Sequence, residues 1–86
     1  MIVRFDKSFL KSIKKLKDSS VKNKIEVLIQ QLEKSTSLSK VPNCRKLSGY
    51  KTYHRIRLGD YRIGLEETEK GEVVLVIVAH RKDIYN

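Results

Sequence analysis

The fold of this chain is decided by an alternating stretch at residues 53–63, which reads YHRIRLGDYRI. Apolar and polar residues take turns on both sides of Gly59-Asp60, a pattern typical of half-buried β-strands. A glycine at the first central position of a two-residue loop favours a type II′ hairpin turn. We therefore predict an antiparallel hairpin in which Arg57 lies opposite Arg62.

This register sorts the side chains onto two faces, because successive residues of a strand point to opposite sides. One face collects apolar residues that suit packing against helices: Ile56, Leu58, Tyr61 and Ile63. The other face collects three arginines, Arg55, Arg57 and Arg62, and Gly64 leaves an open spot opposite Arg55. Directly opposed like charges destabilise a sheet, whereas several guanidinium groups around one space suit an anion. The pattern indicates a phosphate site; the alternative is that the arginines only solvate the open face.

The flanking residues complete an α+β domain over residues 1–86. Residues 2–5 read as a short strand, after which Asp6 can cap a first helix and Ser19 or Ser20 a second one. The second helix has a clear apolar stripe, consisting of Val21, Ile25, Leu28, Ile29 and Leu32. Residues 72–80 form a β-branched, apolar strand. We expect an N-terminal strand, an antiparallel helical hairpin and a three-stranded antiparallel meander, which form one twisted sheet with the helices on one face.

The composition limits the classes of partner and site that fit this chain. The chain has 86 residues, 19 Lys and Arg against 10 Asp and Glu, and a net charge of +9, which attracts polyanions such as nucleic acid. One cysteine, Cys44, argues against a disulfide framework and a cysteine-based zinc site. We predict no membrane-spanning segment, no signal-peptide layout and a cytoplasmic location.

The C-terminal tail adds a basic residue and an aromatic residue to the candidate site. Arg81 follows the last predicted strand and Tyr85 comes four residues later. A cation and an aromatic ring at a strand exit can hold a phosphate and stack a base. Alternatively, Ile84 and Tyr85 form a small clip over the core.

Three segments together resemble the RelE branch of the RelE/ParE toxin superfamily. They are KLSGY at 46–50, YHRIRLGDYRI at 53–63 and HRKDIY at 80–85. The resemblance implies a RelE-like β-α-α-β-β-β fold and a metal-independent endoribonuclease without a cofactor, which cuts mRNA in the ribosomal A site. In such toxins the ribose 2′-OH attacks its own 3′ phosphate and leaves a cyclic phosphate. The matched catalytic positions are Arg55, Arg57, Arg62, Arg81 and Tyr85.

The resemblance also implies partners, namely the ribosome with its mRNA and an acidic, RelB-like antitoxin in a hetero-oligomer. We expect three lysines to add RNA contacts: Lys46, Lys51 and Lys82. A groove ringed by Lys11, Lys14 and Lys15 is the expected dock for the acidic chain.

This sequence departs from the pattern at the general base. Arg55 and Arg57 stand where the best-known members have lysine, and an arginine is a poor base because it keeps its proton. The pKa range of histidine suits a base. His54 shares the parity of Ile56 and reads as structural, so His80 is the candidate.

Two other functions stay open. A ParE-like protein that poisons DNA gyrase shares the scaffold but lacks this set of residues. A basic RNA-binding domain without catalysis would need only the charge.

Overall fold

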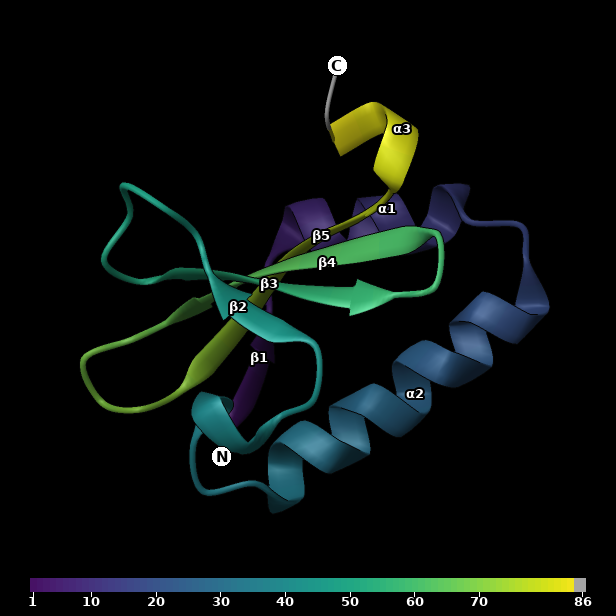
Figure 1. The fold of residues 1–86 in the computed structure, drawn as a ribbon. Coiled ribbons are helices and arrows are strands. Elements are labelled where there is room, and N and C mark those ends of the chain that lie inside the picture. Colours follow the sequence, from purple (N-terminus) through teal and green to yellow (C-terminus); the bar gives the residue numbers. More distant parts are fainter. Residues whose placement is uncertain (85–86) are drawn as a thin grey trace.

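The computed structural model describes residues 1–84, and its element order agrees with the predicted α+β class. The elements are β1 (Val3–Phe5), α1 (Lys7–Lys15), α2 (Ser19–Lys34), the 3₁₀ turn η1 (Leu38–Lys40), β2 (Cys44–Lys46), β3 (Tyr53–Leu58), β4 (Tyr61–Glu67), β5 (Val73–His80) and α3 (Arg81–Ile84). In Figure 1, α1 lies against β5, and α2 runs along the sheet. Among these residues, no helix has the length and apolarity that crossing a bilayer requires.

One five-stranded sheet has the order β1-β5-β4-β3-β2. The predicted meander of β3, β4 and β5 is confirmed, with antiparallel pairing throughout. The sheet has two further features that were not predicted. A further strand, β2, pairs antiparallel with β3, and β1 pairs parallel with β5 because the chain crosses the helical layer before it returns.

Aspartates begin both main helices. The Asp6 carboxylate accepts a hydrogen bond from the Ser8 backbone N–H, as predicted, at 3.2 Å. The cap of α2 is Asp18, which accepts from the backbone N–H groups of Ser20 and Val21, so the expectation of Ser19 or Ser20 is wrong by one or two residues. A carboxylate satisfies otherwise unpaired N–H groups at a helix start and complements the positive end of the helix dipole.

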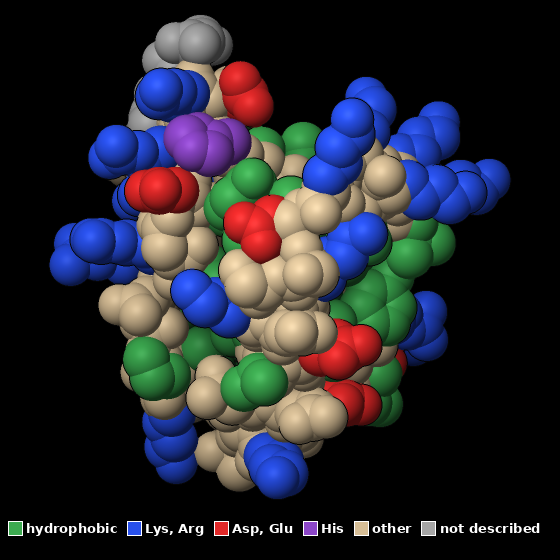
Figure 2. All heavy atoms as spheres, turned by 90° about the vertical axis from the view of Figure 1, so that its right-hand side faces the viewer, with side chains coloured by type: hydrophobic (Ala, Val, Ile, Leu, Met, Phe, Trp, Pro, Cys, Tyr) green, Lys and Arg blue, Asp and Glu red, His purple; other side chains and the backbone are tan. Residues whose placement is uncertain are grey.

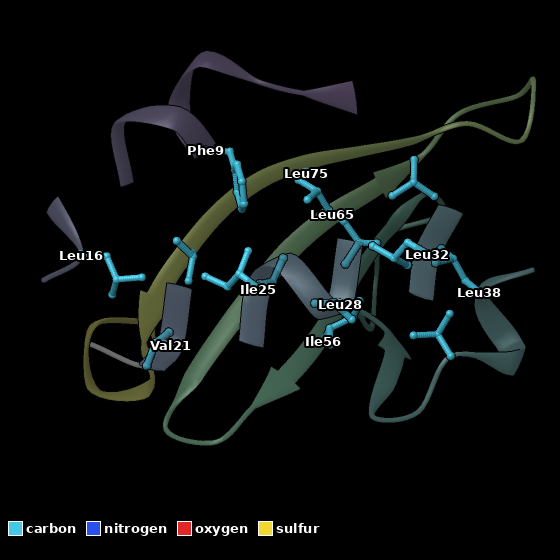
Figure 3. Packing of buried hydrophobic residues seen from close by; sticks show 14 residues of the cluster. Phe9, Leu16, Val21, Ile25, Leu28, Leu32, Leu38, Ile56, Leu65 and Leu75 are labelled. Atoms are coloured by element: carbon cyan, nitrogen blue, oxygen red, sulfur yellow. The ribbon is translucent and has the colours of Figure 1, made fainter. Parts of the chain in front are cut away.

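The core lies between the helices and one face of the sheet. The predicted stripe of α2 supplies Val21, Ile25, Leu28 and Leu32 to it, and Leu32 is fully buried. Figure 3 shows these side chains directed at the sheet, with Leu28 beside Ile56. The sheet contributes residues from its three central strands: Ile56, Ile63, Leu65, Val73, Leu75 and Val78. The opposite face of the sheet is therefore left for the charged residues of the hairpin.

A β-bulge at Val76 changes which residues of β5 face the helices. Leu65 pairs with Leu75 and Gly64 with Ile77, so β5 has one residue more than β4 at this step. Helix α1 covers the irregular backbone through two serines. The Ser8 hydroxyl donates to the Val76 carbonyl, and the Ser12 hydroxyl accepts from the Val78 N–H at 3.1 Å. The bulge lets both Leu75 and Val78 reach the core.

Candidate phosphate-binding site

The hairpin adopts the predicted register. Arg57 pairs with Arg62, Ile56 with Ile63, and Arg55 with Gly64. Gly59 has a φ of +61°, which the first central position of a type II′ turn requires and which a residue with a Cβ adopts only at a cost. Ile56 and Ile63 are buried, so the arginines leave the sheet on its other face.

The arginines surround one polar cavity of about 350 Å³. Its lining consists of Asn43, Arg45, Arg55, Arg57 and Arg62. The three arginines selected from the sequence are thus brought together on one face. A cavity lined by four guanidinium groups and an amide offers many hydrogen-bond donors to an anion, and guanidinium forks match the oxygens of a phosphate.

Arg62 is the most buried of the cationic side chains, with 9% of its surface exposed. Its Nη1 donates to the carbonyl oxygens of Gly59, at 2.7 Å, and Tyr61, at 2.9 Å. Gly59 lies in the hairpin turn and Tyr61 directly follows it, so the turn itself orients the Arg62 guanidinium. Within residues 1–84, neither Arg57 nor Arg62 has a carboxylate within ion-pairing distance. Their charge therefore remains available to a ligand.

Arg45 and Asn43 are site residues that the sequence reasoning missed. Asn43 has a φ of +63° after Pro42, and its carbonyl accepts from the Arg57 N–H at 3.1 Å. This turn starts β2, whose register sets Arg45 opposite Arg55 on the arginine face. A three-residue strand is too short to show a period in the sequence. The basic run from Lys40 to Arg62 is the feature of the sequence that could have pointed to this segment.

Gly64 occupies the middle of the arginine face, opposite Arg55 on one side and Ile77 on the other. A Cβ placed on Gly64 would come within 3.1 Å of Ile77 Cγ2. The glycine therefore keeps open the spot that the sequence predicted beside the arginines.

Arg81 is tied to the same turn as Arg62. Its backbone N–H donates to the Asp60 carbonyl at 2.8 Å, and its Nε lies 3.7 Å from the Asp60 carboxylate. Both side chains of this pair are more than half exposed, and such a surface ion pair is weak. A stronger anion could therefore compete for Arg81. Tyr85, the other predicted tail residue, lies outside the described residues.

His80 faces the helices rather than the arginines. It pairs with Tyr61 across β4 and β5, and the two rings meet edge to face with centroids 5.2 Å apart. Both residues line a cleft of about 710 Å³ beside α1, and the register places them on the face of the sheet opposite Arg62. The bulge at Val76 places the ring there, since it shifts the alternation of β5 by one residue. The sheet thus separates the candidate base from the cavity.

The remaining predicted residues lie around the site rather than in it. His54 is half-buried, and its Nδ1 lies 3.1 Å from the Thr52 carbonyl, which agrees with a structural role. Lys46 pairs with His54, so it leaves β2 on the side opposite Arg55. Lys51 is exposed in the loop before β3, and Lys82 is exposed in α3. Figure 2 shows one side of the molecule, where Lys and Arg side chains project from several parts of the surface.

Comparison with known proteins identifies the family to which this chain belongs. The profile of a family described as the ParE toxin of type II toxin-antitoxin system, parDE, matches residues 3–85. A curated relative from Methanocaldococcus jannaschii, named Toxin RelE3, is 36% identical over 87 residues, which cover 100% of this chain and 97% of the relative. The chain belongs to the RelE/ParE superfamily of type II toxins.

Solved structures agree with this assignment and support the RelE branch. The toxin superposes on the RelB-RelE antitoxin-toxin complex from Methanococcus jannaschii with a TM-score of 0.83 and 34% identity, over 95% of this chain and 94% of that one. It shares its fold with the RelBE2 toxin-antitoxin complex from Mycobacterium tuberculosis, with a TM-score of 0.72 and 21% identity, over 93% and 90% of the two chains.

Proposed function

We propose that this toxin is an endoribonuclease that cleaves mRNA in the ribosomal A site, without a metal or another cofactor. The observation that carries the proposal is the position of Arg57 directly opposite Arg62, both lining one polar cavity. A sheet that served only as a scaffold would gain nothing from two opposed cations. A phosphate between them would offset the repulsion.

The reaction is an in-line attack of the ribose 2′-OH on the adjacent 3′ phosphorus. The bond from phosphorus to the 5′ oxygen breaks, the 2′-OH gives its proton to solvent, and the 5′ oxygen takes one up from solvent. The products are a 2′,3′-cyclic phosphate and a 5′-OH. Negative charge grows on the phosphoryl oxygens during the attack, and fixed guanidinium groups aimed at them lower the barrier. Arg57 and Arg62 supply this clamp, and Arg55 and Arg45 extend it along β3 and β2. Because Arg62 is already held by two carbonyls, little reorganisation is needed when charge develops.

Arg81 is assigned to the leaving oxygen. Its backbone bond to Asp60 fixes the start of α3 at the hairpin turn, while its exposed side chain can leave the weak pair with the Asp60 carboxylate. A cation there stabilises the 5′ oxygen as the bond breaks. Tyr85 is assigned to orienting the nucleotide, on the basis of its match to the family motif.

The position of His80 counts against its role as general base for a phosphate in this cavity, because its ring lies on the helix side of the sheet. The arginines therefore act through charge rather than through proton abstraction. Lys51 and Lys82, both exposed, are proposed to hold the RNA backbone outside the cavity, whereas Lys46 leaves β2 on the opposite side of the sheet.

The toxin is further proposed to be restrained in the cytoplasm by an acidic, RelB-like antitoxin. The solved relative at 34% identity is a complex of RelB with RelE. The cleft beside α1 is lined by Lys11 and Lys15 of the expected trio, with Lys17 in place of Lys14. Asp18 and Asp83 line it too, so the lysines outnumber the acids and favour an acidic segment. Copurification of both proteins from their operon would test this partner.

A ParE-like action on DNA gyrase is the second candidate, because the matching family profile describes a ParE toxin. The polar arginine cavity disfavours it, since a protein-binding surface has no need of opposed arginines.

Induction of the toxin in cells distinguishes these functions. We expect mRNA cut within codons, with cyclic phosphate ends. DNA breaks with intact messages would favour gyrase, and salt-sensitive RNA binding without cut products would favour a non-catalytic role.

A further inference from the structure

Two exposed tyrosines continue the arginine face beyond the cavity. Tyr50, in the loop before β3, is 59% exposed, and Tyr53, at the start of β3, is 39% exposed. Their rings meet edge to face, with centroids 5.8 Å apart and an interplanar angle of 87°. Neither ring belongs to the hydrophobic core.

The pair of Phe5 and Phe9 shows what a structural aromatic pair looks like. Phe5 and Phe9 also have centroids 5.8 Å apart, but Phe9 is 2% exposed and anchors Phe5 to the core. The tyrosine pair lacks such an anchor. Packing against the core therefore accounts for the phenylalanine pair, but it does not account for the tyrosine pair.

Tyr53 is in line with the arginines. It shares the β3 face with Arg55 and Arg57, because alternate residues of a strand point to the same side. Two residues of a strand span about 7 Å, so Tyr53 lies before Arg55 at a spacing that one nucleotide of an extended single strand can cover. The face thus reads, along the strand, as an aromatic ring followed by two cations.

The loop holds Tyr50 beside Tyr53. The Leu47 N–H donates to the Tyr53 carbonyl at 2.9 Å, and the Tyr50 N–H donates to the Leu47 carbonyl at 3.3 Å. Gly49 allows this turn through its φ of +83°. The ring pair is therefore set up by backbone bonds before any ligand arrives.

The arginine face is positive at the cavity and negative beside Tyr53, so its two ends favour different parts of a nucleotide. The cavity is lined by arginines, whereas Tyr53 pairs with Glu66, whose carboxylate accepts from the Thr52 hydroxyl at 3.2 Å. The same carboxylate raises the pKa of Tyr53. A phosphate is repelled at this end, and an uncharged base is not.

We propose that Tyr50 and Tyr53 form a nucleobase-stacking subsite for single-stranded RNA whose phosphate enters the arginine cavity. Stacking on aromatic side chains tolerates any base, because every base has a π-face. The subsite rests on the proposed RNA substrate and would hold the strand in register with Arg57 and Arg62. It positions the substrate without joining the reaction.

The test compares two ligands that differ only in their bases. One is a short single-stranded RNA with 2′-O-methyl groups, which block cleavage, and the other is an abasic ribose-phosphate chain of equal length and the same methylation. Fluorescence anisotropy at low salt measures both affinities for the whole protein. Tyr53→Ala should weaken binding of the RNA by about 5- to 150-fold, the range for one base stacked on an aromatic ring, and leave the abasic chain unaffected.

Three matched variants complete the experiment. Tyr53→Phe keeps the ring and should bind RNA like the unchanged protein. Phe5→Ala removes a similarly exposed ring on β1 and should also bind normally. Arg57→Ala should weaken both ligands, because both carry the phosphates.

The subsite would be overturned if Tyr53→Ala weakened both ligands equally, or if the unchanged protein bound no RNA. It would also be overturned if Tyr53→Ala bound RNA normally and no longer bound the antitoxin. The last result would assign the tyrosines to a protein interface. Tyrosine-dependent RNA binding by a protein that does not cut mRNA on ribosomes would support the subsite and contradict only the proposed cleavage.

Discussion

Arg57 and Arg62 lie directly opposite each other on β3 and β4 and line the same cavity. Their repulsion is built into the sheet by the two-residue turn between them, and within residues 1–84 no carboxylate forms an ion pair with either. The hairpin therefore holds two cations at a spacing that a bound anion would stabilise.

Arg62→Lys should remove most of the cleavage activity while keeping the charge. A lysine cannot hold the Gly59 and Tyr61 carbonyls and still offer a fork to a phosphate. Loss of one preorganised donor typically lowers kcat by about 10²- to 10³-fold. Single-turnover cleavage of a message on programmed ribosomes measures the effect. Arg4→Lys, which alters an exposed arginine paired with Glu72, is the control and should cleave normally.

Gly64→Ala should lower thermal stability, because its Cβ meets Ile77 Cγ2 and the β-branched Ile77 is stiff at χ1. In an Ile77→Ala background the obstacle is gone, and the same change should stabilise the protein by about 0.5–1 kcal/mol, the usual difference between alanine and glycine within a strand. Urea unfolding of the four proteins checks this coupling. An identical effect of Gly64→Ala in both backgrounds would show that Ile77 does not limit the site.

Ser12→Ala should destabilise the fold by about 1–3 kcal/mol, since it leaves the half-buried Val78 N–H at the bulge without its acceptor. Ser39→Ala removes a hydroxyl that meets only Ser37 in an exposed turn, so it should have little effect. Chemical denaturation of both variants provides the comparison. Equal stabilities would mean that water replaces Ser12 at the bulge.

His80→Gln should cleave at about the rate of the unchanged protein. The glutamine can still accept the Lys82 N–H that Nδ1 accepts now, at 3.2 Å. A general base typically contributes about 10²- to 10⁴-fold. A loss of that size, with an unchanged melting temperature, would restore His80 as the base and place the substrate at the end of β5.

The hairpin was predictable because its signals are local. Gly59-Asp60 fixes the turn, and the turn fixes the register that brings Arg57 and Arg62 together. The apolar stripe of α2 was equally plain from its helical spacing, and four of its five predicted residues are buried.

The other features depend on contacts that the local sequence does not carry. Strand β2 is too short to show a period, so Arg45 was missed. The bulge at Val76 exists because Ser8 and Ser12 of α1 satisfy its backbone, and it alone decides the face of His80. The parallel pairing of β1 likewise follows from the path of the chain across the helices.

Mapping the chemistry of RNA ends on ribosomes tests the central claim most directly. Purified toxin, programmed ribosomes and a defined message should give cuts within the A-site codon, with a 2′,3′-cyclic phosphate on one fragment and a 5′-OH on the other. The account predicts that Arg57→Ala and Arg62→Ala each abolish most of these ends while remaining folded. Intact messages with the unchanged toxin, or variants that cleave as well as the unchanged toxin, would contradict it.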